Sequence, residues 1–124
     1  MKNPLSLIVG AELDSVVFIR DYVQFSFQPA SGPRCTLTAV ADPVVRMASK
    51  ETRRVDPGWR DALCTRIGCT VIRAEAIPTL EIALDFDDGM TMLIPLAAGD
   101  AIGAEAAILH RGDVASAVWR IGET

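Results

Sequence analysis

The sequence predicts an α+β fold in which two antiparallel β-meanders pack with two short helices and a closing strand as one domain, residues 1–124. Three observations lead to this prediction. The apolar pattern that begins at residue 16 keeps a single buried face only if the chain reverses. Two more chain-reversing turns are indicated in the second half of the chain. One mid-chain segment has residues typical of a helix start and a helix end at its two termini.

Length, composition and charge restrict the class of protein. The chain has 124 residues, 50% hydrophobic and 23% charged, which is typical of one globular domain. Its net charge of −4 argues against a nucleic-acid partner, because phosphates would be repelled. The apolar run at residues 5–11 is too short for a membrane span and lacks the pattern of a signal peptide. We therefore expect a soluble, cytoplasmic protein without a membrane partner.

The first predicted element is a hairpin in the segment VVFIRDYVQFSF, which begins at residue 16. In one straight strand Asp21 would lie on an apolar face, where an unpaired carboxylate is costly to bury. If the chain turns beside Asp21, Phe18 pairs with Val23 and Val16 pairs with Phe25, so one face is uniformly apolar. Asp21 is therefore predicted to lie at the tip of a hairpin.

Residues 69–96 predict two further turns. A three-residue loop at residues 77–79 aligns the apolar residues of two strands, with Ala74 opposite Ile82. A second loop, at residues 87–89, pairs Phe86 with Met90 and needs its final glycine in the left-handed conformation.

The first predicted helix spans residues 56–68, because an aspartate and a proline open it and a glycine closes it. Trp59, Leu63 and Ile67 recur at a spacing of four residues and predict a buried stripe. Arg66 is expected to face solvent.

The second helix is expected over residues 103–110, with Ala107 and Ile108 facing inward, followed by a closing strand that brings Trp119 onto the core. Residues 46–58 hold four of the twelve basic side chains and are predicted to form a flexible loop. Solvated basic side chains are the favoured interpretation there, and contact with an anionic ligand is the alternative.

The two halves of the chain begin alike. Residues 5–16 and residues 62–74 each place a glycine, Gly10 or Gly68, after an apolar turn, and three predicted strands follow. We interpret this as a degenerate β-β-β-α duplication, although repeated meanders also arise without one.

No metal site, cofactor or catalytic residue is predicted. The three cysteines, at residues 35, 64 and 69, are odd in number and form no CxxC pair, and His110 is the single histidine. Buried free thiols in the protein core are the favoured interpretation for all three. The acidic segment before Gly89 resembles a calcium loop, but its glycine stands one place early and Leu96 occupies the position of the final glutamate.

Five residues form the predicted binding set: Tyr22, Gln24, Trp59, Arg60 and Asp61. An amphipathic aromatic side chain beside polar groups is typical of recognition surfaces. The alternative is structural, because a tyrosine can cover a hairpin tip and a tryptophan can fill the core under a helix.

Several short motifs resemble a family of small uncharacterised bacterial proteins. These motifs are DYVQ, G-[YW]-R-D-x-L-C-x-x-I-G and F-x-D-G followed by EAA, matched at Asp21–Gln24, Gly58–Asp61, Leu63–Cys64, Ile67–Gly68, Phe86, Asp88–Gly89 and Glu105–Ala107. The resemblance spans most of the chain and departs at Ala104, where the family pattern has proline. It implies no activity.

The sequence leads to two hypotheses about function. The first is a non-catalytic protein-interaction module of a bacterial cytoplasm, which forms a homodimer or binds a partner protein; toxin neutralisation is one version. The alternative is a small-molecule-binding domain with its pocket between sheet and helices. The surroundings of Tyr22, Trp59 and Arg60 discriminate, because a flat patch favours a partner protein and a pocket with convergent polar groups favours a ligand.

Overall fold

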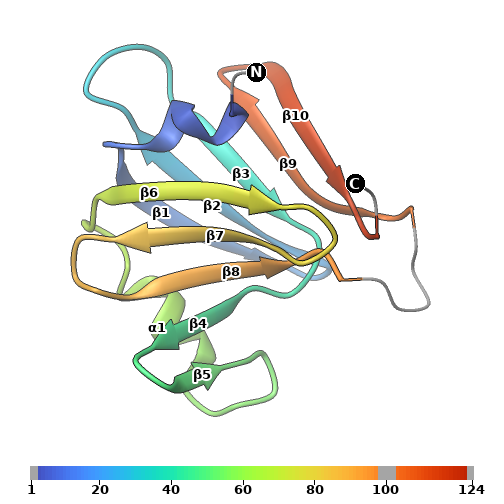
Figure 1. Ribbon diagram of the computed structural model, residues 1–124. Coiled ribbons are helices and arrows are strands. Elements are labelled where there is room, and N and C mark those ends of the chain that lie inside the picture. The colour runs from blue at the N-terminus through green and yellow to red at the C-terminus, as the bar shows by residue number, and fades with distance from the viewer. Residues whose placement is uncertain (1–2, 98–102, 123–124) are drawn as a thin grey trace.

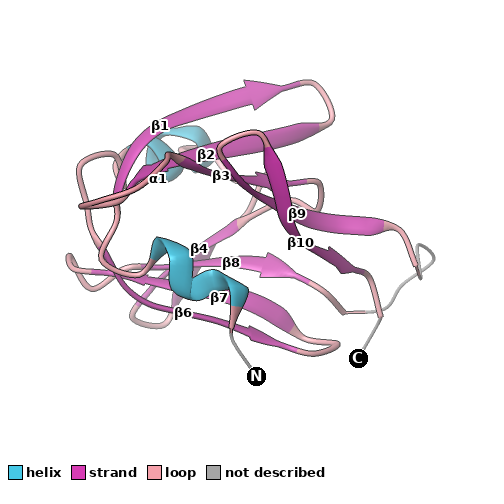
Figure 2. Ribbon diagram, turned by 90° about the horizontal axis from the view of Figure 1, so that it is seen from above, coloured by secondary structure: helices cyan, strands magenta, loops and turns pink. Residues whose placement is uncertain are grey.

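The computed structural model describes residues 3–97 and 103–122, and within these residues the chain is mostly β. The predicted α+β class is therefore wrong. Two five-stranded antiparallel sheets form two layers, sheet A with the order β1-β2-β3-β9-β10 and sheet B with the order β5-β4-β8-β7-β6 (Figures 1 and 2). The strands are β1 (Glu12–Ile19), β2 (Tyr22–Gln28), β3 (Cys35–Ala39), β4 (Val44–Met47), β5 (Lys50–Thr52), β6 (Val71–Ile77), β7 (Glu81–Phe86), β8 (Thr91–Pro95), β9 (Glu105–Arg111) and β10 (Val114–Arg120).

Helical structure within the described ranges is limited to the 3₁₀-helix η1 (Pro4–Ile8) and the α-helix α1 (Trp59–Cys64). Neither is long and apolar enough to cross a membrane.

The helix predicted at residues 103–110 is a strand, β9. Alanines give this segment a high helix propensity, but β9 pairs on one edge with β3 and on the other with β10, and this pairing overrides propensity. Ala107 is fully buried as expected, whereas Ile108, on the opposite face, is only partly buried. The closing strand is confirmed as β10, and Trp119 packs against the core.

Helix α1 is shorter than predicted and ends before the expected stripe is complete. Gly58, at a φ of 83°, precedes the helix, while the Asp56 carboxylate accepts a hydrogen bond from the Arg53 backbone N–H instead of capping it. Because the helix ends early, the side chains that follow change face. Ile67 is 45% exposed and Arg66 is only 3% exposed, the reverse of the prediction.

The predicted flexible loop at residues 46–58 is wrong in its first half, which belongs to the β4–β5 hairpin. Arg46 pairs with Glu51 across this hairpin, and the two side chains form an ion pair at 2.8 Å.

Two of the predicted reversals are confirmed. In the β1–β2 hairpin Phe18 faces Val23, as the apolar pattern requires, and Asp21 is exposed at the tip. At the β7–β8 turn the Phe86 N–H bonds to the Met90 carbonyl.

The third reversal has a different register. Ala74 faces Leu84 rather than Ile82, because the loop between β6 and β7 spans residues 78–80. A β-bulge at the start of β6 turns Ile72 outward, where it is 59% exposed.

Substituting Asp21 with asparagine is expected to lower the free energy of unfolding by less than about 1 kcal/mol, since the side chain is exposed and asparagine also suits a turn. Urea denaturation followed by circular dichroism measures the change. Unfolding of the variant in buffer would show that Asp21 contributes more to the stability of the protein than its exposure indicates.

The two halves of the chain have the same order of elements. Each begins with a short helix, continues through a three-strand meander and ends in a hairpin, so the order differs from the β-β-β-α unit expected. The final hairpin of each half joins the sheet of the other half: β4 pairs with β8, and β9 pairs with β3.

The equivalence of the halves extends to single backbone hydrogen bonds. Gly10 and Gly68 have φ values of 84° and 90°, and each is followed by a strand with a β-bulge near its start. The Gly10 N–H donates to the Val71 carbonyl, and the Gly68 N–H donates to the Leu13 carbonyl, at 2.7 and 2.8 Å. The two strand starts therefore pair with each other about a local twofold axis and join the sheets at this edge.

One apolar core lies between the sheets. Its largest fully buried side chains include Phe25 and Phe27 from sheet A and Phe86 from sheet B. The two helices add Leu5 and Leu63, both fully buried.

Candidate functional site

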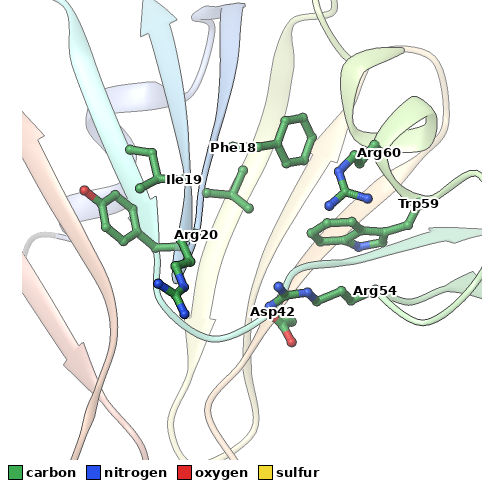
Figure 3. A pocket seen from close by; sticks show the side chains of 9 residues that line it. Phe18, Ile19, Arg20, Asp42, Arg54, Trp59 and Arg60 are labelled. Atoms are coloured by element: carbon green, nitrogen blue, oxygen red, sulfur yellow. The ribbon is translucent and has the colours of Figure 1, made fainter.

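The tip of the β1–β2 hairpin and the N-terminal end of α1 form the walls of a half-open pocket of about 170 Å³ (Figure 3). The connection from β3 to β4 and the loop after β5 complete it. The pocket is lined by Phe18, Ile19, Arg20, Tyr22, Val23, Asp42, Arg54, Trp59 and Arg60. The hairpin tip thus meets residues that lie between positions 42 and 60 of the chain.

Trp59, the first residue of α1, forms a rigid wall of the pocket. It is 4% exposed, and its indole Nε1–H donates a hydrogen bond of 2.8 Å to the carbonyl of Pro43. Its ring meets Phe18 edge to face, with centroids 5.8 Å apart and an interplanar angle of 63°. The buried hydrogen bond and the aromatic contact hold the indole in one orientation.

Arg60 lies against the same two rings. Its guanidinium carbon is 5.7 Å from the centroid of Phe18 and 5.9 Å from that of Trp59, which are cation–π distances (Figure 3). Within the described part of the chain Arg60 forms no ion pair. The rings therefore orient the guanidinium without neutralising its charge.

Two further arginines line the pocket. Arg54 forms an ion pair of 3.0 Å with Asp42, and both side chains are about half exposed. Arg20 stands on the opposite side, at the exposed hairpin tip (Figure 3), and forms no ion pair with any residue that the structure describes. Three arginines and one carboxylate line the pocket, so it carries a positive excess in a chain whose net charge is −4.

The structure brings three of the five predicted binding residues together, since Tyr22, Trp59 and Arg60 all line the pocket. Gln24 does not; it lies on the outer face of sheet A, where its Nε2 donates to Thr38 Oγ1 at 3.4 Å. Asp61 lines an adjoining hollow of about 210 Å³ at the α1 N-terminus, which shares Arg54, Trp59 and Arg60 with the pocket.

Sequence reasoning missed Arg20 and Asp42, and it treated Arg54 mainly as a solvated side chain. Arg20 adjoins the predicted hairpin tip, so the turn prediction placed it beside Tyr22. Its proximity to α1 depends on contacts between distant segments, for which the sequence carries no local signal.

The groups most often used in catalysis lie elsewhere. His110 is in β9, opposite Thr36 of β3, and no cysteine lines the pocket. The prediction of buried thiols is correct only for Cys35, because Cys64 is exposed and Cys69 is partly buried. Burial raises the pKa of the Cys35 thiol, and burial and then the Asp88 carboxylate raise the pKa of the Cys69 thiol, so both thiolates are disfavoured. Among the described residues, no three side chains of metal-ligating type are grouped.

Comparisons with protein-family models, with curated protein sequences and with solved structures find no match to this chain. The family resemblance drawn from the motifs therefore stays a prediction. What the pocket can bind is therefore inferred from its own lining residues and their geometry.

Proposed function

We propose that this protein is a non-catalytic binding protein that holds an anionic group of a small molecule in the pocket between the β1–β2 hairpin tip and α1. One observation carries the proposal: Arg20, Arg54 and Arg60 line one pocket against a single carboxylate, Asp42. A cluster of guanidinium groups is the usual protein device for carboxylate and phosphate recognition.

The arrangement of the arginines supports this proposal. Arg60 is already oriented by Phe18 and Trp59, so little side-chain entropy is lost when an anion binds. Arg54 is positioned by its ion pair with Asp42. Because the exposed Arg20 has the freedom to turn toward the bound group, it supplies a second or third donor.

The size of the pocket restricts the ligand. Its volume is about 170 Å³. Drug-sized ligands occupy about 300–1,000 Å³. A phosphate or carboxylate with a short apolar or aromatic stem fits, and the stem would lie against Trp59.

The chemistry of the lining favours binding over catalysis. Around this pocket the structure places neither an imidazole nor a thiol, and the Asp42 carboxylate is paired with Arg54. The Tyr22 phenol is the remaining proton donor besides the guanidinium groups and suits a hydrogen bond to an anion. A cytoplasmic location is part of the proposal and is supported by the three free cysteines.

Removing the Arg60 guanidinium is expected to weaken the binding of phenyl phosphate about tenfold or more, the usual effect of losing one charge-assisted hydrogen bond. Isothermal titration calorimetry with phenyl phosphate, inorganic phosphate and uncharged phenol measures the affinities. Phenol is expected not to bind, and the affinity of phenyl phosphate should fall as salt is added.

Arg73→Ala is the matched control, because it also removes one positive charge but lies in β6, away from the pocket, with its side chain 67% exposed. Equal weakening by Arg60→Ala and Arg73→Ala would mean that only net charge matters. Failure of both phosphates to bind at millimolar concentration would contradict an anion site of this kind.

A partner protein is the second candidate, and one observation favours it. Arg54 also lines two adjoining hollows, of about 340 and 210 Å³, so three hollows share this side chain. An extended acidic segment of a partner can contact more than one of them. Tighter binding of a glutamate hexapeptide than of phenyl phosphate, lost in Arg60→Ala, would favour this candidate.

A further inference from the structure

The arginine-lined pocket adjoins a second and larger hollow, which we call the middle hollow. It has a volume of about 340 Å³ and is lined by the connection from β3 to β4 and by the loop after β5. Asp42 and Arg54 line both the pocket and the middle hollow, so their ion pair lies where the two meet (Figure 3). Both side chains are about half exposed, and an ion pair of this kind contributes little stability, so it can shift aside at small cost.

The middle hollow differs from the pocket in its chemistry. Two of its three charged side chains form the Asp42–Arg54 ion pair. The third, Arg53, forms an ion pair with Glu51. The other five of its eight lining residues are apolar: Ala41, Pro43, Val44, Val55 and Pro95. The middle hollow therefore presents apolar side chains and no unpaired charge, whereas the pocket presents an excess of arginine.

The middle hollow has a recessed floor and an exposed apolar rim. Val44 lies on the outer face of sheet B, because its neighbour Val45 points into the core, and yet Val44 is only 5% exposed. Val55 is 90% exposed, the highest value for a large apolar side chain among the residues that the structure describes. An apolar group in the middle hollow would remove Val55 from water, which is favourable.

The pocket and the middle hollow are held in a fixed relation to each other. Trp59 lines the pocket and Pro43 lines the middle hollow, and the indole N–H of the first donates a buried hydrogen bond of 2.8 Å to the carbonyl of the second. A ligand that occupies both hollows therefore finds them already arranged, which lowers the entropic cost of binding.

We propose that the ligand is a free amphipathic anion, whose carboxylate or phosphate head binds in the pocket and whose apolar chain of medium length lies in the middle hollow. This inference rests on the proposed function, because it assigns the rest of the molecule whose anionic group the pocket holds. The two hollows, of about 170 and 340 Å³, together fall within the range of about 300–1,000 Å³ that drug-sized ligands occupy. Because the chain itself fills the middle hollow, a lipid whose chains stay in a bilayer does not fit.

A third hollow, which we call the end hollow, limits the length of the chain. Its volume is about 190 Å³, and it shares Val44, Arg53 and Pro95 with the middle hollow but no lining residue with the pocket. Glu81 lines the end hollow and forms no ion pair with any residue that the structure describes. An apolar chain that reached this carboxylate would displace water from an uncompensated charge, so we expect the chain to end within the middle hollow.

Isothermal titration calorimetry with ethyl, butyl, hexyl and octyl phosphate tests the inference. The affinity is expected to rise about two- to fourfold with each added methylene group, because complete burial of one methylene group corresponds to about fourfold. In Val55→Asn, octyl phosphate should bind about fivefold or more weakly, because a valine side chain contributes more than one methylene group. Ethyl phosphate should keep its wild-type affinity for this variant, since its short chain stays in the pocket.

Val114→Asn is the matched control, because it also replaces an exposed valine with asparagine but lies in β10 and lines none of the three hollows. It should bind every alkyl phosphate like the wild type. Binding of ethyl phosphate without any gain toward octyl phosphate would overturn the inference and leave the anion site in place. An unchanged affinity of Val55→Asn for octyl phosphate, or stronger binding to phosphatidic acid vesicles than to octyl phosphate, would also overturn it. Failure of all four phosphates to bind would overturn the proposed function as well.

Discussion

Asp88→Asn is expected to lower the free energy of unfolding by about 3 kcal/mol, the low end for breaking a buried ion pair because the Asp88 side chain is 31% exposed. Its Oδ2 lies 2.7 Å from Nη1 of Arg66, whose side chain is only 3% exposed. Nε and Nη1 of Arg66 have no hydrogen-bond partner among the described residues, so the attraction between the two charges is what compensates this buried cation. Without the carboxylate, Arg66 is a buried and uncompensated cation.

The substitution by asparagine removes the ion pair with Arg66 but can keep the hydrogen bond that the Asp88 side chain makes in the turn. The Asp88 Oδ1 accepts a hydrogen bond from the Met90 N–H, and the amide oxygen of asparagine can accept the same bond. Urea denaturation of the two proteins gives the difference in stability.

Arg66→Met is the companion variant and is expected to change stability little or to raise it. Arg66 stands two residues before Gly68, and the equivalent residue two before Gly10 is Ile8, which is fully buried. The repeat therefore shows that this position accepts an apolar side chain. In the double variant Arg66→Met/Asp88→Asn most of the lost stability should return, and a loss that stays near 3 kcal/mol would contradict the ionic explanation.

Gly89→Val is expected to destabilise the protein by about 1–3 kcal/mol through backbone strain. Gly89 has a φ of 87°, which a β-branched residue rarely adopts. A Cβ built at Gly89 meets no atom within 4 Å, so packing contributes nothing and the cost is conformational.

Gly89→Asn should cost visibly less, because asparagine tolerates the left-handed region. Denaturant melts of the two variants provide the comparison. Equal losses of stability in the two variants would show that the left-handed backbone conformation of Gly89 is not the cause of the destabilisation.

The sequence predicted those parts of the fold that depend on the matching of neighbouring faces. Asp21 and Gly89 were placed in turns because only those turns keep apolar residues on one side, and the observed pairs of β1–β2 and β7–β8 agree. The β6–β7 register was missed because loops at residues 77–79 and 78–80 both leave Ala74 on the same face as Ile82 and Leu84, so the apolar pattern does not distinguish them.

The errors arise where distant segments decide the structure. Residues 103–110 have helical propensity, but β3 and β10 supply partners on both edges, which a local pattern does not reveal. Arg66 was placed in solvent because its ionic partner is 22 residues away. At the candidate site the chemistry of Trp59 and Arg60 was recognisable, whereas the contribution of Arg20 required the packing of the hairpin tip.

The exchange of hairpins between the halves has a consequence for folding. Neither sheet is complete until both halves are present, since Leu37 of β3 pairs with Leu109, 72 residues further along the chain. Such long-range pairing slows folding, and the edges of β3 and β8 stay open to intermolecular pairing until it is complete. Cleavage between β5 and α1 would leave two fragments that fold only by complementing each other.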